Sequence, residues 1–420
     1  MLQTMANALR SEDLRKKLLF TAFILLIFRF GSFVPVPGVD LESVQSAIDD
    51  RGSRLLDFLN LFAGGALTRF AVFALGIMPY ITASIILQLM TVVIPSLEKL
   101  QKEGESGQQK ITQYTRYSTV GLAFVQSFAY VLYFRSQDAL PNLDGTTFYL
   151  IIISLTAGTT LVMWLGELIT QRGVGNGISL LIFASIVASV PAALEGWWNL
   201  EPVSQAIVAV IALLVVVGVV FVNEGQRRIP IQYAKRVVGR RMTSGGTTYM
   251  PLRVNMAGVI PVIFASAVVI IPATFAEFGG RGSFFQDVSD FLAPGSWYYI
   301  AFEATLIVLF TYFYTAVVFN PVDQADNLKK HGGYIPGVRP GRPTAVYLDR
   351  VITRLTLPGA IYLAAIAEMP NITFQYLPDT NVFFFALGGT SILIIVGVAL
   401  DTIRQMEAQL MMRSYEGFLK

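Results

Sequence analysis

Two pairs of isoleucines, Ile77 with Ile81 and Ile178 with Ile182, are each spaced four residues apart and each follow a break in an apolar stretch. The breaks are the motifs GIMP and GVGNG. Residues four apart share one helix face. Branched apolar side chains offer no fixed hydrogen bonds, so such faces serve apolar contact. Core packing or contact with lipid is the usual role of isoleucine pairs of this kind, and the backbone break before each pair is what singles these two out.

The stretch that must position the first pair, Ala63–Gln88, is apolar but does not resemble one continuous membrane helix. Two glycines open it, and Gly76 and Pro79 interrupt it. Glycine weakens a helix interior and proline removes a backbone donor, which hydrocarbon tolerates only next to protein or a water-filled cavity. The sequence predicts a half-helix over Ala66–Ala74, a hinge, and a second helix over about Met78–Val93. Broken helices of this kind are typical of channels and transporters.

The composition points to a polytopic membrane protein. Of 420 residues, 54% are hydrophobic and only 14% are charged, against roughly 25% charged in a soluble domain. Cysteine is absent and His331 is the single histidine, which excludes disulfides, thiolate metal sites and a multi-histidine site. There is also no Walker motif and no HExxH motif. We therefore expect no cofactor, no metal and no catalytic residues.

Ten apolar stretches approach the roughly 20 residues that a membrane span requires. They are about Leu18–Phe33, Gly76–Ile94, Tyr117–Phe134, Phe148–Ile169, Ile178–Leu194, Val203–Val222, Ala257–Ala276, Trp297–Val318, Ala345–Ile366 and Val382–Leu400. The ninth carries Asp349, Arg350 and Arg354 in its first turns. The alternative for this stretch is that the charged turn lies in the membrane interface.

An even number of spans places both termini on one side, and the distribution of basic residues decides which side. Lysine and arginine number 23 in the segments on the side of the termini and 5 in the opposite loops. This asymmetry predicts cytoplasmic termini. Ten spans can be divided into two halves of five. Because each half then crosses the membrane an odd number of times, the two halves have opposite orientations, which favours an inverted repeat. No residue-level repeat is evident, so an irregular bundle is the alternative.

Two loops on the side of the termini are candidate partner sites. Asn223–Asn255 holds seven basic residues and one acid, and is expected to continue the preceding helix before a hairpin-like tip at Arg240–Met242. It fits anchoring on anionic lipid, or docking on an acidic or phosphate-rich partner, for which arginine is the better ligand. In Asn320–Thr344, Pro-Gly pairs flank Arg339 and predict an arginine held on a stiff turn. A plain connector is the alternative there.

Ionisable residues are scarce within the spans. Glu167 and Glu303 are expected near span ends, and Arg29 late in the first span. Transporters coupled to protons or sodium normally carry ionisable groups at mid-depth. The sequence shows no cluster of carboxylates at the membrane centre, which argues against that class.

Six motifs in order along the chain resemble the bacterial SecY family, the pore subunits of the Sec protein translocon. They are GIMPYITASIILQL (76–89), GVGNGISLLIFA (173–184), YAKRVVGRR (233–241), NMAGVIPVIFAS (255–266), IPGVRPG (335–341) and GGTSILIIVGVALD (388–401). The resemblance runs from near the amino terminus to the last helix, with no major departure from the family pattern.

The resemblance implies an all-α integral membrane protein of ten transmembrane helices in two inverted five-helix halves around an hourglass pore. The halves would be residues 18–194 and 195–400, between a cytosolic segment at 1–17 and a cytosolic tail at 401–420. A lateral gate would lie between spans two and three and spans seven and eight. The family's pore-ring positions fall on Ile77, Ile81, Ile178, Ile182, Ile263 and Ile394. Its plug corresponds to about residues 64–73, including Gly64, Gly65, Ala66, Leu67, Thr68, Arg69 and Phe70.

The resemblance also implies partners and a location. The basic loops, with Arg240, Arg241 and Arg339, match those that contact the ribosome or the motor ATPase SecA. Further expected partners are the SecE and SecG subunits, unfolded preproteins or signal peptides, and anionic lipids, without direct DNA binding. The expected location is the bacterial cytoplasmic membrane. A secondary transporter would need a polar mid-membrane site, and an inert scaffold would leave the six isoleucines unexplained.

Overall fold

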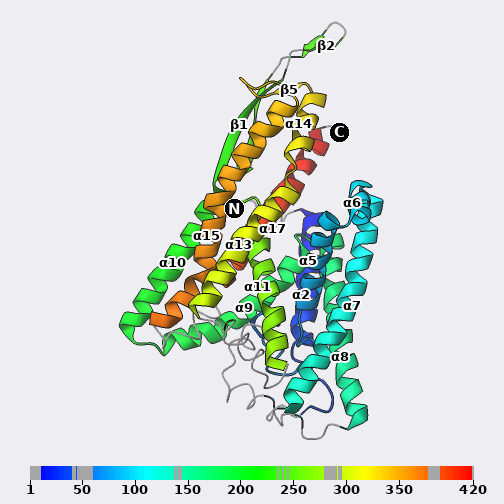
Figure 1. Ribbon diagram of the computed structural model, residues 1–420, viewed down its shortest axis with the longest axis vertical. Coiled ribbons are helices and arrows are strands. Elements are labelled where there is room, and N and C mark those ends of the chain that lie inside the picture. Colours follow the sequence, from blue (N-terminus) through cyan, green and yellow to red (C-terminus); the bar gives the residue numbers. More distant parts are fainter. Residues whose placement is uncertain are drawn as a thin grey trace.

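The computed structural model describes residues 11–39, 44, 60–136, 140, 144–233, 236–238, 241–243, 246–278, 291, 296–376 and 388–418. Each of the ten predicted spans overlaps a helix (Figure 1). These helices are α2 (Glu12–Gly31), α5 (Met78–Val93), α7 (Glu105–Ser136), α8 (Gly145–Arg172), α9 (Gly177–Trp198), α10 (Pro202–Glu224), α11 (Ile260–Phe278), α13 (Trp297–Val318), α15 (Arg342–Tyr376) and α17 (Gly389–Phe418). Two short helices, α6 (Pro95–Lys102) and α14 (Pro321–Lys330), lie outside the predicted spans.

Length and apolarity qualify most of these helices as membrane spans. Within the described part of the chain, seven meet both criteria, and the bent pair α5 and α6, which meet at 99°, makes up to eight. The long helix α10 has only 17% of its most apolar window buried. Leu213 and Phe221 on this helix are 64% and 78% exposed. Such an apolar surface is suited to lipid, as expected of a multi-pass membrane protein.

Local sequence explains where several helices begin. Asn176, Ser296 and Asn320 precede α9, α13 and α14, and each side chain accepts a hydrogen bond from a backbone N–H in the first turn. Proline occupies the first turn of α5, α6, α10 and α14, where its missing N–H costs nothing.

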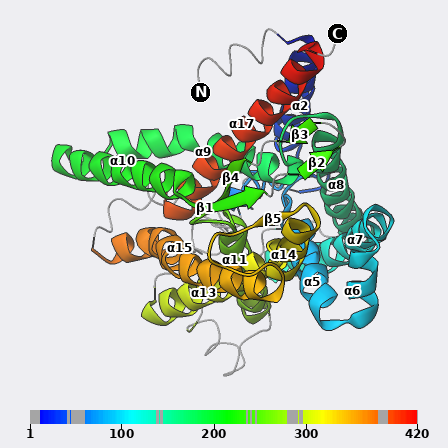
Figure 2. The same ribbon diagram turned by 90° about the horizontal axis from the view of Figure 1, so that it is seen from above.

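The helices form two groups that follow the order of the chain. In the first group α5 packs on α7, α7 on α8, and α8 on α9 and α2. In the second, α13 packs on α11 and α15, and α17 on α10 and α15. The groups meet where α9 contacts α17 and where α5 and α7 contact α11, which lies towards the centre in the view from above (Figure 2). The bundle therefore has two seams between its groups.

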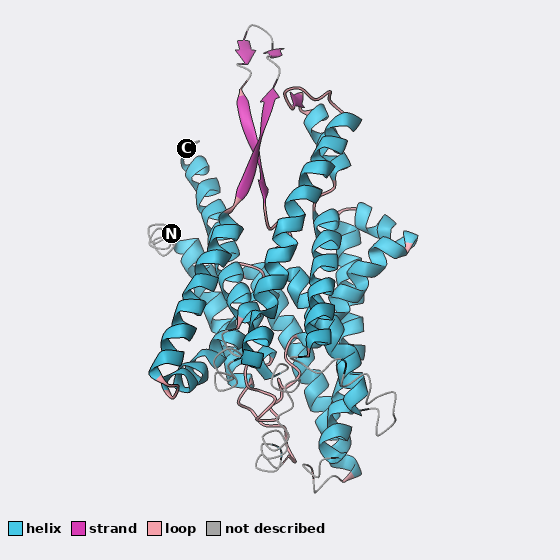
Figure 3. Cartoon of the chain, turned by 60° about the vertical axis from the view of Figure 1, so that its left-hand side comes forward, coloured by secondary structure: helices cyan, strands magenta, loops and turns pink. Residues whose placement is uncertain are grey.

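The beginning of α2 and the end of α17 lie at the same end of the bundle. Leu14, Val174 and Met406 form one buried cluster, and Lys17 Nζ donates to Gln409 Oε1 at 3.3 Å. The strands, α6 and α14 project from this same end (Figures 1 and 3). This arrangement agrees with an even number of spans.

The basic loop after α10 is a β-hairpin, so the predicted continuation of the helix is wrong. The helix ends at Glu224, and β1 (Gln226–Tyr233) pairs antiparallel with β4 (Thr247–Arg253). A smaller pair, β2 (Arg236–Val238) and β3 (Arg241–Thr243), forms its outer part, close to the predicted tip. In β1, buried Ile229 and Ile231 flank exposed Pro230, and this alternation favours a strand. The two-residue strand β5 (Gly333–Tyr334) joins the other edge of β1.

Residues 63–77, here called the buried turn segment, are a series of turns and not the predicted half-helix over Ala66–Ala74, which is wrong. The backbone φ angle is positive at Gly64, Gly65 and Gly76 (65°, 79° and 56°) and at Phe70 (41°). A left-handed residue ends the helical hydrogen-bond pattern. Glycine adopts it freely, whereas at Phe70 it is a strained conformation that its surroundings must hold.

Small residues let this segment pack closely against its neighbours. A Cβ on Gly158 of α8 would lie 1.9 Å from the carbonyl oxygen of Val72. A Cβ on Gly31 of α2 would lie 2.1 Å from the ring of Phe73. The sequence therefore places glycine where α2 and α8 contact the buried turn segment.

Replacing Gly158 by alanine is expected to destabilise the protein, because the added Cβ collides with the Val72 carbonyl. Gly121 on α7 is the matched control: a Cβ there has nothing within 4 Å, and alanine is the better helix former by about 1 kcal/mol. Apparent thermal unfolding midpoints of the purified protein in detergent should fall by several degrees for Gly158→Ala and not for Gly121→Ala. Equal midpoints would contradict the close packing of this segment on α8.

Candidate functional site

The six isoleucines singled out from the sequence all belong to, or pack against, the largest buried apolar cluster. Ile77, Ile81, Ile182 and Ile394 are 5% exposed or less. Ile178 and Ile263 are half-buried and pack against the same cluster. The six come from the buried turn segment and α5, α9, α11 and α17, which are the elements that meet at the two seams.

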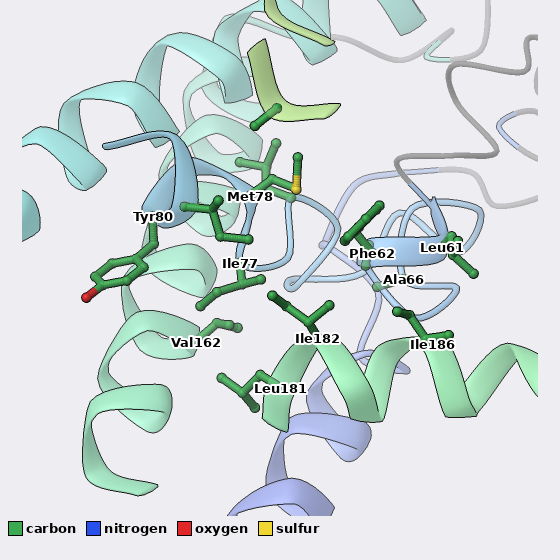
Figure 4. Close-up of a cluster of buried hydrophobic side chains, with 14 of the residues drawn as sticks. Leu61, Phe62, Ala66, Ile77, Met78, Tyr80, Val162, Leu181, Ile182 and Ile186 are labelled. Carbon is green, nitrogen blue, oxygen red and sulfur yellow. The ribbon is translucent and has the colours of Figure 1, made fainter. Parts of the chain in front are cut away.

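Side chains from the buried turn segment and from α9 face each other across this cluster. Figure 4 shows Ile77 and Ile182 pointing towards one another, with Ala66 and Ile186 farther along the same interface. Gly64 lies so close to α9 that a Cβ would be 3.2 Å from Ser185 Cα. The contact is made by carbon atoms, so it excludes water without fixing a polar partner.

A cavity of about 440 Å³ opens next to the cluster. Ile182, Ile263 and Ile394 line it together with polar residues of α9, α10, α17 and the segment before α11. Asn176, Arg253 and Asp401 are among these polar residues, and they lie near the end of the bundle that carries the hairpin. The cavity thus has apolar residues from both groups and polar residues towards the hairpin.

The buried turn segment is held in place from the side of α2. Arg29 Nη1 donates to the carbonyl oxygen of Gly64 at 2.6 Å. The guanidinium carbons of Arg29 and Arg69 lie 4.6 and 4.2 Å from the ring centroid of Phe33, within the range of cation–π attraction. Val36 N–H donates to the Phe70 oxygen at 3.0 Å. These contacts explain how the strained backbone at Phe70 is maintained.

Two of the three predicted partner-binding arginines, Arg241 and Arg339, lie at the hairpin end. Arg339 is exposed and follows a turn in which Val338 N–H donates to the Ile335 oxygen at 3.0 Å, with Gly337 at a φ of 81°. The stiff turn predicted around Arg339 is present. Arg241 begins β3, and Arg240 lies outside the described residues. The preceding part of the loop is the helix α14, which the sequence did not indicate.

The structure adds a buried pair of carboxylates that the sequence analysis did not single out, and one of them, Glu303, lies in the second turn of α13, near the span end expected for it. Glu303 on α13 and Glu368 on α15 are 4% and 3% exposed, and their carboxyl groups interact directly. Ser266 Oγ of α11 donates to Glu303 Oε1 at 3.0 Å, and Asn371 Nδ2 donates to Glu368 Oε2 at 2.9 Å. Neither glutamate lines the cavity described above. The pair and Ser266 therefore join three helices of the second group, α11, α13 and α15.

Glu167 is also paired, in agreement with its expected place near a span end. Arg116 of α7 contacts it through two oxygens, at 2.8 and 2.6 Å. This bidentate ion pair fixes α7 to α8.

Comparison with known proteins places the chain in a family. A family model described as SecY matches residues 71–403. The protein translocase subunit SecY of Mycobacterium tuberculosis strain H37Rv is 49% identical over 443 residues, covering 100% of both chains. The chain belongs to the SecY family. The SecY subunit of Streptomyces galbus is 50% identical over 443 residues, again across 100% of both chains.

Solved structures related to the SecY family share the fold. One described as a protein-conducting channel superposes with a TM-score of 0.66 at 18% identity, over 93% of this chain and 91% of that chain. A second, whose description assigns its SecY plug domain to the closed state and the membrane seal, gives 0.65 at 17% identity over the same shares. The all-α, ten-helix fold class predicted from the sequence is confirmed.

Replacing Arg29 by alanine is expected to loosen the buried turn segment of this SecY family chain. The Gly64 carbonyl loses its hydrogen bond, and the Phe33 ring loses its cation–π contact with Arg29. The chain has no native cysteine, so a single Ala66→Cys reports on access to the segment. Maleimide should label this cysteine at least several-fold faster with Arg29→Ala than without it. Arg135→Ala, at an exposed position on α7, is the control and should leave the rate unchanged.

Proposed function

We propose that this chain is a protein-conducting channel that passes unfolded preproteins across the bacterial cytoplasmic membrane. The observation that carries the proposal is the apolar cluster at the seams between the two helix groups, next to a cavity lined by Ile182, Ile263 and Ile394. The 49% identical relative is named a protein translocase subunit. In this proposal the six isoleucines form the pore ring, and the buried turn segment acts as the plug.

The chemistry of the ring suits a channel for any sequence. Branched apolar side chains close a narrow passage by excluding water and have no fixed hydrogen bonds to give to one substrate. They re-form their contacts with each other and with the buried turn segment when the polypeptide leaves. No covalent step is required, so the channel has no catalysis of its own and draws its driving energy from a docked partner.

The seam at which α5 and α7 contact α11 is the proposed lateral gate. Hydrophobic segments of a preprotein leave the wet pore through it because lipid is the better solvent for them. When this seam opens while α9 and α17 stay in contact, such hydrophobic segments move from the pore into the lipid and are thereby inserted into the membrane.

Charge supports the proposed orientation and partners. The hairpin end carries the excess of lysine and arginine, which supports a cytoplasmic location for the termini, the hairpin and α14 in this proposal. There Arg240, Arg241 and Arg339 are proposed to contact SecA or the ribosome. A related Sec61 structure is described in a ribosome-channel complex. SecE and SecG are the proposed accessory subunits, and anionic lipids the proposed lipid partners.

The channel proposal is tested by making the ring polar. Ile81→Asn with Ile182→Asn should raise the resting ion conductance in planar bilayers, because water and ions enter a seal that offers hydrogen bonds. Ile81 and Ile182 are 5% and 1% exposed. The matched control is Leu213→Asn on the lipid-facing surface, where the side chain is 64% exposed. Conductance that stays at the wild-type level in the double variant would contradict the proposed seal.

The docking proposal is tested by charge reversal. Arg240→Glu, Arg241→Glu and Arg339→Glu together should weaken SecA binding at least tenfold, since each removes a cation and adds an anion facing an acidic or phosphate-rich partner. Lys99→Glu, Lys102→Glu and Lys110→Glu together, at exposed positions of α6 and α7, change the net charge by the same amount and are the control. Thermal unfolding should be unchanged in both variants. If the triple variant bound SecA and the ribosome with wild-type affinity, the proposed partner-binding role of these arginines would be contradicted.

A further inference from the structure

Two buried glutamates contact each other where α13 and α15 run side by side (Figure 1). Glu303 of α13 is 4% exposed and Glu368 of α15 is 3% exposed. A hydrogen bond joins their carboxyl groups, and both helices are candidate membrane spans. The proposed channel function uses neither side chain, so the pair needs an explanation of its own.

A hydrogen bond between two carboxyl groups requires a proton. An ionised carboxylate can only accept, whereas a carboxylic acid has one O–H to donate. Two carboxylates that share one site also repel each other, so both cannot stay ionised. The contact therefore means that at least one of the two carboxyl groups is a carboxylic acid.

The two glutamates differ in the donors that serve them. Ser266 Oγ of α11 donates to Glu303 Oε1 at 3.0 Å, and Tyr299 of α13 also hydrogen-bonds to this carboxyl group. Glu368 has one such donor, Asn371 Nδ2, at 2.9 Å from Oε2, and its buried Oε1 accepts from none. Buried acceptors in native proteins are normally satisfied. The donors therefore favour Glu303 as the acceptor and Glu368 as the acid.

No basic side chain neutralises the pair within the part of the chain that the structure describes. The ion pairs found there include neither Glu303 nor Glu368. Among the described neighbours named above, Tyr299 is the one further ionisable group. Helix α17, which also packs on α15, has no ionisable residue before Asp401. A proton is thus the positive charge that these contacts leave for the pair.

We propose that Glu303 and Glu368 form a proton-binding site among α11, α13 and α15, in which Glu368 is a carboxylic acid that donates a hydrogen bond to Glu303. The ligand is a proton and not a metal ion, because the free oxygen of Glu368 is buried and leaves no room for a larger cation. The site does not depend on the proposed function.

The proton makes the packing of the second helix group depend on pH. When the proton leaves for bulk water, two anions remain in contact, which favours separation of α13 from α15. Ser266 extends this effect to α11, since it lies three residues after Ile263 on the helix that contacts α5 and α7. Proton release is therefore expected to loosen the second group next to that seam.

Infrared spectroscopy of the purified full-length protein, in a detergent without ester groups, tests the site. The C=O stretch of a carboxylic acid is separate from the carboxylate bands and shifts in D2O. At neutral pH the wild type should show this band and Glu368→Gln should lose it, whereas Glu303→Gln should keep it at a shifted frequency. Glu167→Gln is the matched control and should leave the band unchanged, because Glu167 pairs with Arg116 as an ionised carboxylate.

Thermal unfolding gives a second readout. The folded state keeps a proton that an exposed glutamate of the unfolded chain has already released, so stability falls as the pH rises. Between about pH 6 and about pH 9, both above the range in which an exposed glutamate titrates, the midpoint of the wild type should fall by a few degrees more than that of Glu368→Gln. The glutamine keeps an N–H to donate and has no proton to lose. Glu195→Gln, at an exposed position of α9, should follow the wild type.

Absence of a carboxylic acid band from the wild type at neutral pH overturns the proton site, and this result does not depend on the folding of any variant. A band that is lost in Glu303→Gln and kept in Glu368→Gln overturns Glu368 as the acid. A band that persists in both variants and in the double variant belongs to another residue and also overturns the site. Midpoints of the wild type and Glu368→Gln that respond alike to pH do the same.

Discussion

Apolar contact between side chains from two separate groups of helices is the interaction on which the rest of this structure depends. Ile77 and Ile81 come from the first group with Ile182, and Ile394 comes from the second, yet all four are nearly fully buried in one cluster. Burial of this kind is favourable and non-directional. It therefore holds the two groups together without requiring one fixed arrangement of donors and acceptors.

The buried turn segment packs against that cluster in one fixed conformation, which non-directional apolar contact alone does not determine. Polar and aromatic contacts supply the precision that apolar burial lacks. Arg29 holds the Gly64 carbonyl, and Phe70 packs edge-on against Phe134 with ring centroids 5.1 Å apart. The positive φ at Phe70 is retained because these neighbours fix the backbone on both sides. Apolar contact forms the buried cluster, and directional contacts position the segment that packs against it.

Periodicity and charge in the sequence were sufficient for the ten helices, the common side of the chain ends and the stiff turn before Arg339. They failed where tertiary packing decides. The half-helix over Ala66–Ala74 was wrong because a left-handed Phe70 cannot be recognised in an apolar run. Glu368 was missed because its approach to Glu303 depends on how α15 packs on α13. The strand β1 could have been found, since Ile229 and Ile231 alternate with Arg228, Pro230 and Gln232, none of which is buried. The pore-ring role of the isoleucines stays a prediction.

Cysteine cross-linking between the channel and an arrested preprotein tests the central claim most directly, because the chain has no cysteine of its own. Single cysteines would replace Ile182, Ile263 or Ile394, and Leu213 on the lipid-facing surface of α10 would serve as the reference. The account predicts that one cysteine in the arrested polypeptide forms disulfides with the three ring positions at the same point in its sequence, and not with position 213. Transport that proceeds without cross-links at any ring position would contradict it.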